Sequence, residues 1–259
     1  MRTFNYTRES VASDEGPASR SADPARGGER EATTYTDSMK PDPYLVVVDY
    51  DAGNLRSVER ALAHAELEPV VTADPADLAR ADGVVLPGVG AASDTMAKLR
   101  ERGLVDPLRA FVASGRPFLG VCMGLQALLD SSEEGGGQEC LGLLPGEVRH
   151  FGFDDLKVPH MGWNQVEWVR EHPITAGIPS GSYFYFVHSF YPAPTDPDLA
   201  LAQTTYGLTF PSVLARNNIV ATQFHPEKTG PAGLALYANF VAWVRETAAP
   251  NIPAHIPGR

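Results

Sequence analysis

The sequence has little cysteine, little basic charge and no long apolar run. Its two cysteines, Cys122 and Cys140, lack the close spacing of a metal site and cannot build a disulfide framework. Lys and Arg total 21 against 32 Asp and Glu, and the net charge of −11 argues against a nucleic-acid partner, which needs a basic face. No apolar stretch is long enough to cross a membrane as a helix. We therefore expect a cytoplasmic protein that binds neither nucleic acid nor membrane and holds no metal.

The chain also lacks a Gly-rich phosphate-binding loop with its lysine, and we expect no cofactor. Its 259 residues, 43% of them hydrophobic, are enough for one domain with a sizeable core. Cys140 follows a Gly-rich loop and is most simply a structural residue.

Residues 1–43 are rich in Arg, Glu, Asp, Ser, Ala and Pro and show no apolar periodicity. They predict a disordered extension ahead of a single domain over residues 44–259. Their acidic content argues against a transit peptide, and the absence of a hydrophobic core argues against a secretory signal. Met39 stands just before the first predicted strand, and the simplest hypothesis is that translation starts there.

From residue 44 onward, strand and helix patterns alternate. Residues 44–50 are typical of a strand buried on both faces, and Asn54 is a plausible N-cap for a helix with Val58 and Leu62 on one face. The remaining pattern predicts strands near 69–72 and 84–86, helices over 93–102, 106–114 and 232–247, and short strands and turns after residue 131, including 183–190. This alternation predicts an α/β fold with an open, mainly parallel sheet and helices on both faces. Functional groups should gather outside the carboxyl ends of its strands.

Cys122 lies in a Gly-x-Cys-x-Gly turn between an apolar strand and a helix-forming stretch. Gly120 and Gly124 allow a sharp turn that presents the thiol at the carboxyl end of the strand, as in the serine version of this elbow. The N–H groups and the dipole of the helix favour a thiolate there and can stabilise an oxyanion. The alternative is a small buried hydrophobic residue, but the two flanking glycines favour a nucleophile.

His225 is the candidate base for that thiol. Residues 219–224 are typical of a strand, and Pro226 biases His225 toward an extended backbone and ends the strand. Two residues further along extended chain, Glu227 projects to the same side and can orient the imidazole. A His-Pro-Glu tripeptide alone is compatible with a simple loop, yet beside the Cys122 turn it predicts a Cys-His-Glu triad.

Together these motifs resemble those of the class I (triad) glutamine amidotransferases. The stretches GVCMGLQ, around Cys122, and QFHPEK, around His225, carry the family likeness. Four further segments resemble the glutaminase subunits of imidazole glycerol phosphate synthases: residues 49–58, 86–91, 158–164 and 185–190. The resemblance implies a flavodoxin-like fold and the hydrolysis of glutamine to glutamate and ammonia by Cys122, His225 and Glu227.

The resemblance implies more site residues than the triad. The residues implied for the oxyanion loop are Gly88, Val89, Gly90 and Met123. Those implied for substrate contact are Gln126, His188, Ser189 and Phe190. The alternatives are an ordinary βα turn for the loop, a solvated helix residue for Gln126 and a core strand for 183–190. We expect His188 to be structural, because one base suffices for the chemistry. Ala92, where the family usually has Phe, and Asp51 depart from the family pattern and leave the packing of the loop open.

The implied partner is a (β/α)8 cyclase subunit that forms a heterodimer with this chain and receives ammonia through an internal passage. The assembly would make imidazole glycerol phosphate and aminoimidazole carboxamide ribotide in histidine biosynthesis. Residues 158–164, expected as a loop, would lie near the docking face. The implied interface residues are Asn54, Arg56, His160, Trp163, Asn164 and Lys228. Basic groups beside the site would suit an acidic patch on the partner, although Arg56 could simply be solvated.

Two other functions stay open on the sequence alone. The chain could supply ammonia to another synthase, such as anthranilate or pyridoxal phosphate synthase, although segments 49–58 and 158–164 argue against that. It could also be a catalytically silent regulatory subunit of the cyclase. The intact set of Cys122, His225 and Glu227 argues against a silent subunit.

Overall fold

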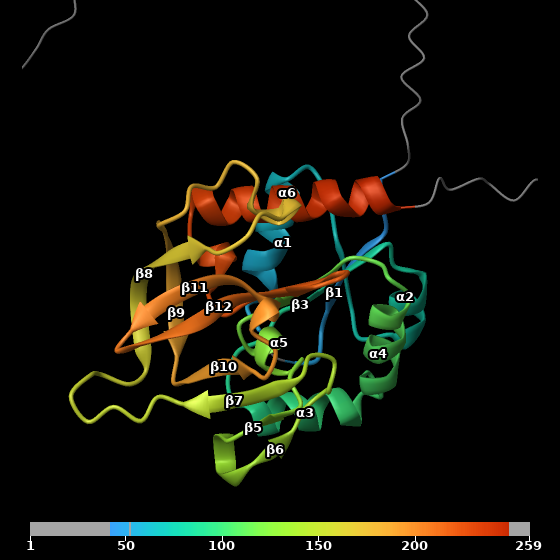
Figure 1. Cartoon of the computed structure of the whole chain (residues 1–259). Helices are drawn as coiled ribbons and strands as arrows, with labels where there is room; N and C mark the ends of the chain where they lie inside the picture. The colour runs from blue at the N-terminus through green and yellow to red at the C-terminus, as the bar shows by residue number, and fades with distance from the viewer. Residues whose placement is uncertain (1–41, 52, 249–259) are drawn as a thin grey trace, which may run out of the picture. The chain divides into compact units, whose positions relative to one another are not determined.

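The computed structural model describes residues 42–51 and 53–248. Apart from residues 42 and 43, the predicted extension and the hypothetical start at Met39 lie outside this region, and both stay predictions. The described chain is built around a nine-stranded sheet with the order β2-β1-β3-β4-β13-β12-β11-β8-β9 (Figure 1). Its strands are β1 (Leu45–Val48), β2 (Val70–Thr72), β3 (Gly83–Leu86), β4 (Phe118–Val121), β8 (His160–Trp168), β9 (Ser182–His188), β11 (Ala200–Tyr206), β12 (Leu208–Arg216) and β13 (Ile219–Thr222).

The predicted open α/β sheet is confirmed, with a division that the sequence did not indicate. The five strands from β2 to β13 in the sheet order are parallel, while β12, β11, β8 and β9 pair antiparallel. A separate four-stranded sheet has the order β10-β7-β5-β6. Its strands are β5 (Ser131–Ser132), β6 (Gln138–Glu139), β7 (Gly146–His150) and β10 (Phe190–Pro194).

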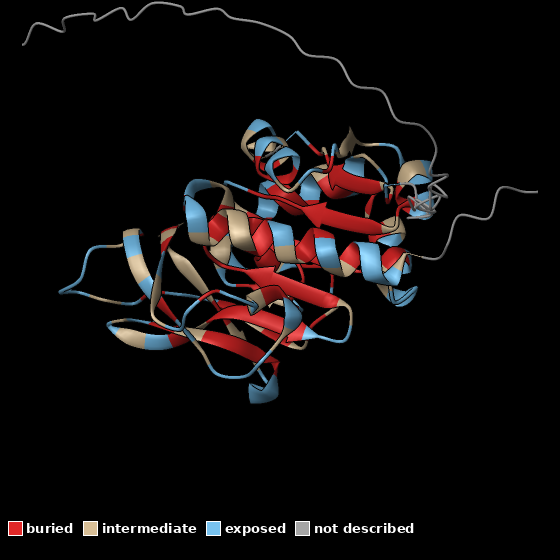
Figure 2. Cartoon of the chain, turned by 90° about the horizontal axis from the view of Figure 1, so that it is seen from above, coloured by how far each residue is buried: buried red, intermediate tan, exposed pale blue. Residues whose placement is uncertain are grey.

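Helices cover both faces of the parallel strands, as predicted. The α-helices are α1 (Leu55–His64), α2 (Pro75–Arg80), α3 (Ala92–Glu101), α4 (Val105–Ala113), α5 (Met123–Gln126) and α6 (Pro231–Thr247). Because side chains alternate along a strand, Leu45 and Val47 of β1 join a cluster with α1 and α6, while Val46 and Val48 join one with α2, α3 and α4. Strands β1, β3, β4 and β13 are therefore buried between two layers of helices, as Figure 2 shows by colour, while the edge strand β2 is half-buried.

One local prediction was wrong, and one helix was not predicted. Residues 158–164 were expected as a loop, yet β8 starts at His160 and pairs with β9 in register His160↔His188. The strand is hard to recognise because its apolar residues Met161 and Trp163 face solvent while polar residues alternate with them on the inner side. Helix α2 was missed, although Asp74 caps it by accepting a hydrogen bond from the backbone N–H of Ala76 at 2.8 Å.

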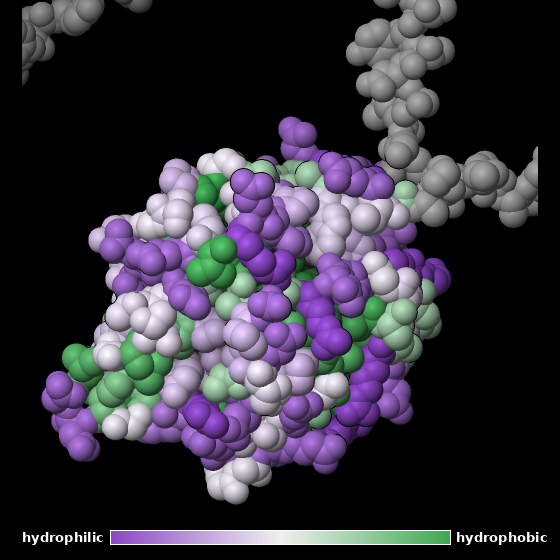
Figure 3. Space-filling model, in the orientation of Figure 1, coloured by the Kyte–Doolittle hydropathy of each residue, from purple (hydrophilic) through white to green (hydrophobic). Residues whose placement is uncertain are grey.

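The surface of the described region shows no large apolar area in the view of Figure 3, where hydrophobic residues form small, separate patches. Within residues 42–51 and 53–248, none of the helices combines the length and apolarity needed to cross a bilayer.

The 3-10 helices are η1 (Glu134–Gly136), η2 (Pro173–Thr175), η3 (Pro197–Leu199) and η4 (Pro226–Lys228). Helix α6 approaches η4 closely because it carries Gly233 at the contact. A Cβ atom on Gly233 would overlap the carbonyl group of Pro226 and lie 2.9 Å from Cβ of Thr229. The absence of a side chain here therefore sets the position of the η4 turn.

We predict that Gly233→Ala lowers the free energy of unfolding by about 2 kcal/mol, because the added methyl group overpacks the α6–η4 contact. The measurement is urea unfolding followed by circular dichroism. Gly152→Ala is the matched control, since a Cβ atom there meets nothing within 4 Å, and its stability should stay close to that of the unaltered protein. Equal midpoints for the two variants would contradict the prediction.

Candidate active site

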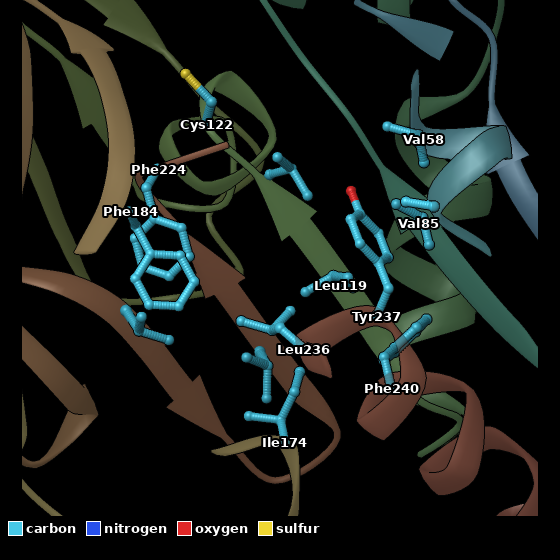
Figure 4. Close-up of a cluster of buried hydrophobic side chains, with 14 of the residues drawn as sticks. Val58, Val85, Leu119, Cys122, Ile174, Phe184, Phe224, Leu236, Tyr237 and Phe240 are labelled. Atoms are coloured by element: carbon cyan, nitrogen blue, oxygen red, sulfur yellow. The ribbon is translucent and has the colours of Figure 1, made fainter. Parts of the chain in front are cut away.

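Cys122 occupies a strained turn at the carboxyl end of β4. Its backbone has φ 54 and ψ −105, a conformation that residues with a side chain rarely adopt, and α5 begins at the next residue. A Cβ atom on Gly124 would overlap the Leu86 carbonyl, and one on Gly120 would lie 2.9 Å from the Gly124 carbonyl oxygen. Figure 4 shows Cys122 at the strand end, above the packed rings of Phe184 and Phe224. The structure therefore has the elbow that the glycine spacing predicts.

The backbone brings His225 next to this elbow. Strand β13 pairs in parallel with β4, and the N–H of Cys122 donates to the Thr222 carbonyl at 2.7 Å. His225 follows β13 in an extended conformation, and its N–H donates to the Tyr185 carbonyl at 2.9 Å. Residues that lie far apart in the sequence are thereby held at one edge of the sheet.

His225 and Glu227 form a buried pair. Nδ1 of His225 lies 2.8 Å from Oε1 of Glu227, and both side chains are 2% exposed. Glu227 sits in the η4 turn and not on the extended chain that was expected, so a tight turn brings the carboxylate back to the imidazole. Nε2 of His225 is buried and has no hydrogen-bond partner among the described residues.

Charge dominates the titration of His225. Burial by itself lowers the pKa of an imidazole, because it disfavours the charged form. The negative charges of Cys122 and Glu227 outweigh burial and raise the pKa of His225 to about 10. The arrangement thus favours the charged imidazolium form of His225 at neutral pH.

A cavity of about 410 Å³ opens in front of Cys122. Its lining residues are Val89, Gly90, Cys122, Met123, Gln126, Glu134, Pro159, Val187, His188, Ser189, Phe190, His225 and Lys228. Most of the site residues expected from the sequence therefore meet at one cavity. Asn54, Arg56, Gly88, His160, Trp163 and Asn164 are not among them, and Glu227 lies behind His225.

Glu134 is the charged residue of this cavity that the sequence reasoning missed. It lies in η1, and its Oε2 accepts a hydrogen bond from the backbone N–H of Ala92 at 2.5 Å. Glu134 thus binds the first N–H of α3, at Ala92, which is one of the residues where this chain departs from the family pattern. Only the Gly-rich stretch after Glu134 marked the segment, and such a stretch does not indicate which cavity the loop reaches.

The loop after β3 is packed against the elbow. Tyr50 donates a hydrogen bond from its hydroxyl to the Pro87 carbonyl at 2.9 Å, which anchors the loop from below. A Cβ atom on Gly88 would lie 2.6 Å from that hydroxyl and 2.7 Å from Cβ of Met123. Gly90 has φ 92, in the region that favours glycine, so both glycines have a structural requirement.

The alternative reading of Gln126 as a solvated residue is wrong, because its side chain is 2% exposed. Its Nε2 donates to the Phe190 carbonyl at 3.0 Å. Its Oε1 is buried, and no hydrogen-bond partner for it exists in the described part of the chain. Gln126 therefore has one amide atom still available at the cavity.

His188 and His160 form a buried hydrogen-bonded row. Nδ1 of His188 lies 2.7 Å from the Phe190 carbonyl oxygen, and Nε2 of His188 lies 2.9 Å from Nδ1 of His160. Nε2 of His160 in turn lies 3.2 Å from Nδ2 of Asn164, which also donates to the Thr205 carbonyl at 3.0 Å. The Phe190 carbonyl can only accept, so the proton of His188 lies on Nδ1. The NH2 group of Asn164 can only donate, so Nε2 of His160 accepts and the proton of His160 lies on Nδ1, directed at His188. Each histidine is therefore neutral. Burial lowers the pKa of His160 to about 4 and that of His188 to about 3.

The six residues expected at the partner interface differ in exposure, and Asn54 and Asn164 among them are half-buried. Arg56, Trp163 and Lys228 are exposed, and Nζ of Lys228 lies 5.9 Å above the ring of Tyr185. His160 is buried in the row described above, and its burial does not fit a direct interface contact. His160 can affect an interface only by positioning its neighbours on β8.

We predict that acid weakens folding through His188. Its pKa is lower in the folded chain than the ordinary value of 6.5, so its stabilising contribution is complete above pH 6.5 and is lost as pH falls toward 3. Between pH 6.5 and pH 5 the loss is about 2 kcal/mol, since one pKa unit corresponds to about 1.4 kcal/mol.

The test compares His188→Gln with the unaltered protein by urea unfolding at pH 7, 6 and 5. The unfolding free energy of the variant should fall less steeply, because the variant has no imidazole to protonate. Parallel slopes would refute the prediction.

Comparison with known proteins agrees with this geometry. The family Glutamine amidotransferase class-I matches residues 46–243. The imidazole glycerol phosphate synthase subunit HisH of Nitrosococcus oceani is 51% identical over 203 residues, which cover 77% of this chain and 97% of that subunit. The HisH subunit of Dehalococcoides mccartyi is 47% identical over 196 residues, covering 76% and 95%. The structure of PurLQS from Thermotoga maritima aligns with a TM-score of 0.63 at 18% identity, covering 78% of this chain and 99% of that one, and supports the fold alone.

The family match includes both strands that carry the site, β4 and β13, and the residues that follow them. The two HisH subunits match nearly along their whole length. The chain therefore belongs to the class-I glutamine amidotransferases, in the group of the HisH subunits of imidazole glycerol phosphate synthase.

Proposed function

We propose that this protein hydrolyses the side-chain amide of glutamine at Cys122, as the ammonia-producing subunit of an imidazole glycerol phosphate synthase. The observation that carries the proposal is the placement of Cys122 on a strained elbow, facing a cavity beside the buried His225–Glu227 pair. A nucleophile, a base and a group that orients the base are the minimal set for acyl transfer.

The reaction follows from these positions. The Cys122 thiolate attacks the side-chain carbonyl of glutamine and forms a tetrahedral intermediate. His225, charged in the resting pair, gives its proton from Nε2 to the departing amine, and ammonia leaves. Water then attacks the γ-glutamyl thioester, loses its proton to the imidazole and releases glutamate. Glu227 holds Nδ1 of His225 throughout and keeps Nε2 directed at the reacting atoms.

The intermediate needs hydrogen-bond donors for its oxyanion. Met123 is the first residue of α5, where backbone N–H groups have no partner within the helix. The loop of Val89 and Gly90 lines the same cavity and would supply the second N–H. Gly88 packs tightly against Met123, so the loop that carries the second donor lies directly beside the first donor.

Glutamine also carries an ammonium and a carboxylate that the cavity must recognise. Glu134 offers a carboxylate that can accept from the substrate ammonium. Oε1 of Gln126 offers a buried acceptor for the amide nitrogen of the substrate. Ser189 brings a hydroxyl that can donate to the substrate carboxylate. His188 is already engaged at both ring nitrogens, so it shapes the cavity wall and does not serve as a second base.

The partner in this proposal is the cyclase subunit, and the outer side of the β8–β9 hairpin is its docking surface. Met161, Trp163 and Tyr183 are each 56% exposed there, and Lys228 at the cavity rim adds a positive charge. Exposed aromatic and Met side chains near a site are typical of protein interfaces. Docking here would bring the mouth of the cavity, and the ammonia made in it, to the partner.

The decisive experiment measures glutamate production from glutamine by the protein alone, with a cyclase subunit, and with the cyclase and its ribotide ligand. We expect little activity alone and a large rise in the ligand-loaded complex. Cys122→Ala should lower glutamine-dependent synthesis by at least about 10³-fold, because the nucleophile is lost, while ammonia-dependent synthesis by the complex is retained. Glutamine-dependent synthesis by Cys122→Ala would eliminate the proposed mechanism.

We predict that Trp163→Ala weakens binding of the cyclase subunit about 10-fold to 30-fold, because exposed tryptophans at interface centres carry much of the binding energy. Titration calorimetry measures the dissociation constant. Val169→Ala is the matched control, since Val169 is also exposed, at 49%, but follows the other end of β8. Equal effects of the two substitutions would place the docking surface elsewhere.

A further inference from the structure

Gln223 lies against the sulfur of Cys122, although the mechanism above does not use it. The residue follows β13, its side chain is completely buried, and its backbone N–H donates to the Ser212 carbonyl at 2.8 Å. Nε2 of Gln223 lies 3.8 Å from Sγ of Cys122, and Oε1 of Gln223 lies 3.0 Å from Nε2 of Gln126. Gln223 therefore connects the sulfur with the wall of the cavity.

The surrounding hydrogen bonds determine which amide atom faces the sulfur. The Phe190 carbonyl can only accept, so the Gln126 atom 3.0 Å from it must be the NH2 nitrogen. The second hydrogen of that nitrogen is directed to Gln223, which must present its oxygen. The NH2 group of Gln223 is consequently turned to Cys122, and an orientation with the oxygen there would bring two donors together.

The Phe190 carbonyl, from which this orientation is deduced, is fixed by further hydrogen bonds. The Phe190 carbonyl also accepts from Nδ1 of His188 at 2.7 Å, and His188 accepts from His160 at 2.9 Å. The row ends on Asn164, which donates to the Thr205 carbonyl. Both ends of the row are backbone carbonyls, so no member can reverse its direction without losing a buried hydrogen bond.

We propose that Gln223 is a further catalytic residue, whose side-chain NH2 group donates a hydrogen bond to the Cys122 thiolate. This inference rests on the proposed function, in which that thiolate is the nucleophile. In a buried site an N–H directed at an anion stabilises it strongly, because water cannot screen the interaction. Gln223 would thus stabilise the thiolate, while Gln126, anchored on Phe190, keeps the Gln223 amide in the required orientation.

Two substitutions test whether Gln223 acts by donating a hydrogen bond to the sulfur or only by filling space beside it. Gln223→Met keeps the approximate volume and removes the donor. Gln223→Glu keeps an acceptor for Gln126 but replaces the donor with an oxygen facing the sulfur. We expect both to slow alkylation of Cys122 by iodoacetamide at pH 7 about 10-fold or more, since hydrogen bonds to charged groups are stronger than neutral ones. In the cyclase complex, kcat for glutamine hydrolysis should fall about as much, with KM changed less than 3-fold.

The matched control is Gln203→Met, because Gln203 lies on β11 of the same sheet, is half-buried and lines a separate polar groove. It should leave both rates unchanged. Urea unfolding shows whether each variant is folded, and if Gln223→Met does not fold, Gln223→Glu decides the question alone.

The outcomes distinguish this inference from the proposed function. If the unaltered protein in its complex hydrolyses no glutamine, the proposed function fails. If it does, and the folded Gln223→Glu variant is alkylated and turns over at the unaltered rates, the donor role of Gln223 is overturned. A rise in KM with unchanged kcat and alkylation would equally overturn it, because it would assign Gln223 to shaping the substrate cavity.

Discussion

The parallel pairing of β4 with β13 is the constraint on which the rest of the site depends. Both strands run in the same direction, so the residues that follow them emerge at the same edge of the sheet. The register pairs Val121 with Thr222, and the hydrogen bond from Cys122 to Thr222 continues it by one residue. A slip of one residue would turn the side chains of β13 to the opposite face and move His225 away from the thiol.

The close packing around the elbow maintains the backbone strain at Cys122. Three glycines make this packing possible: Gly88 in the loop after β3, and Gly120 and Gly124 in the elbow itself. Each position excludes a Cβ atom, so the turn cannot relax without displacing backbone. The strained φ of Cys122 is thus held by its surroundings, which also hold the proposed oxyanion donors beside the sulfur.

Three buried histidines show how environment separates chemically identical side chains. Burial alone would lower the pKa of His225, but the negative charges of Cys122 and Glu227 outweigh it and raise this pKa to about 10. His188 and His160 face carbonyls, an amide and one another, and burial lowers their pKa to about 3 and about 4. The first imidazole is suited to proton transfer, whereas the other two are suited to holding the Phe190 carbonyl, and through it Gln126, in one orientation.

The sequence by itself indicated the alternation of strands and helices, the elbow at Cys122 and the pairing of His225 with Glu227. These features depend on local chemistry: glycines that permit a turn, a proline that ends a strand, and an apolar run that is buried on both sides. The α/β sheet follows from the alternation, and with it the meeting of the two strand ends.

Only the tertiary structure decided which side chains surround the thiol. Glu134 reaches the cavity from η1, and Gln126 turns inward to Phe190. His160 is buried on β8, although its neighbour Met161 and nearby Trp163 on the same strand face solvent. These placements depend on contacts between segments far apart in the chain, for which local sequence carries no signal. The direction of the Gln223 amide is the clearest example, because it is determined by a hydrogen bond to a residue 97 positions away.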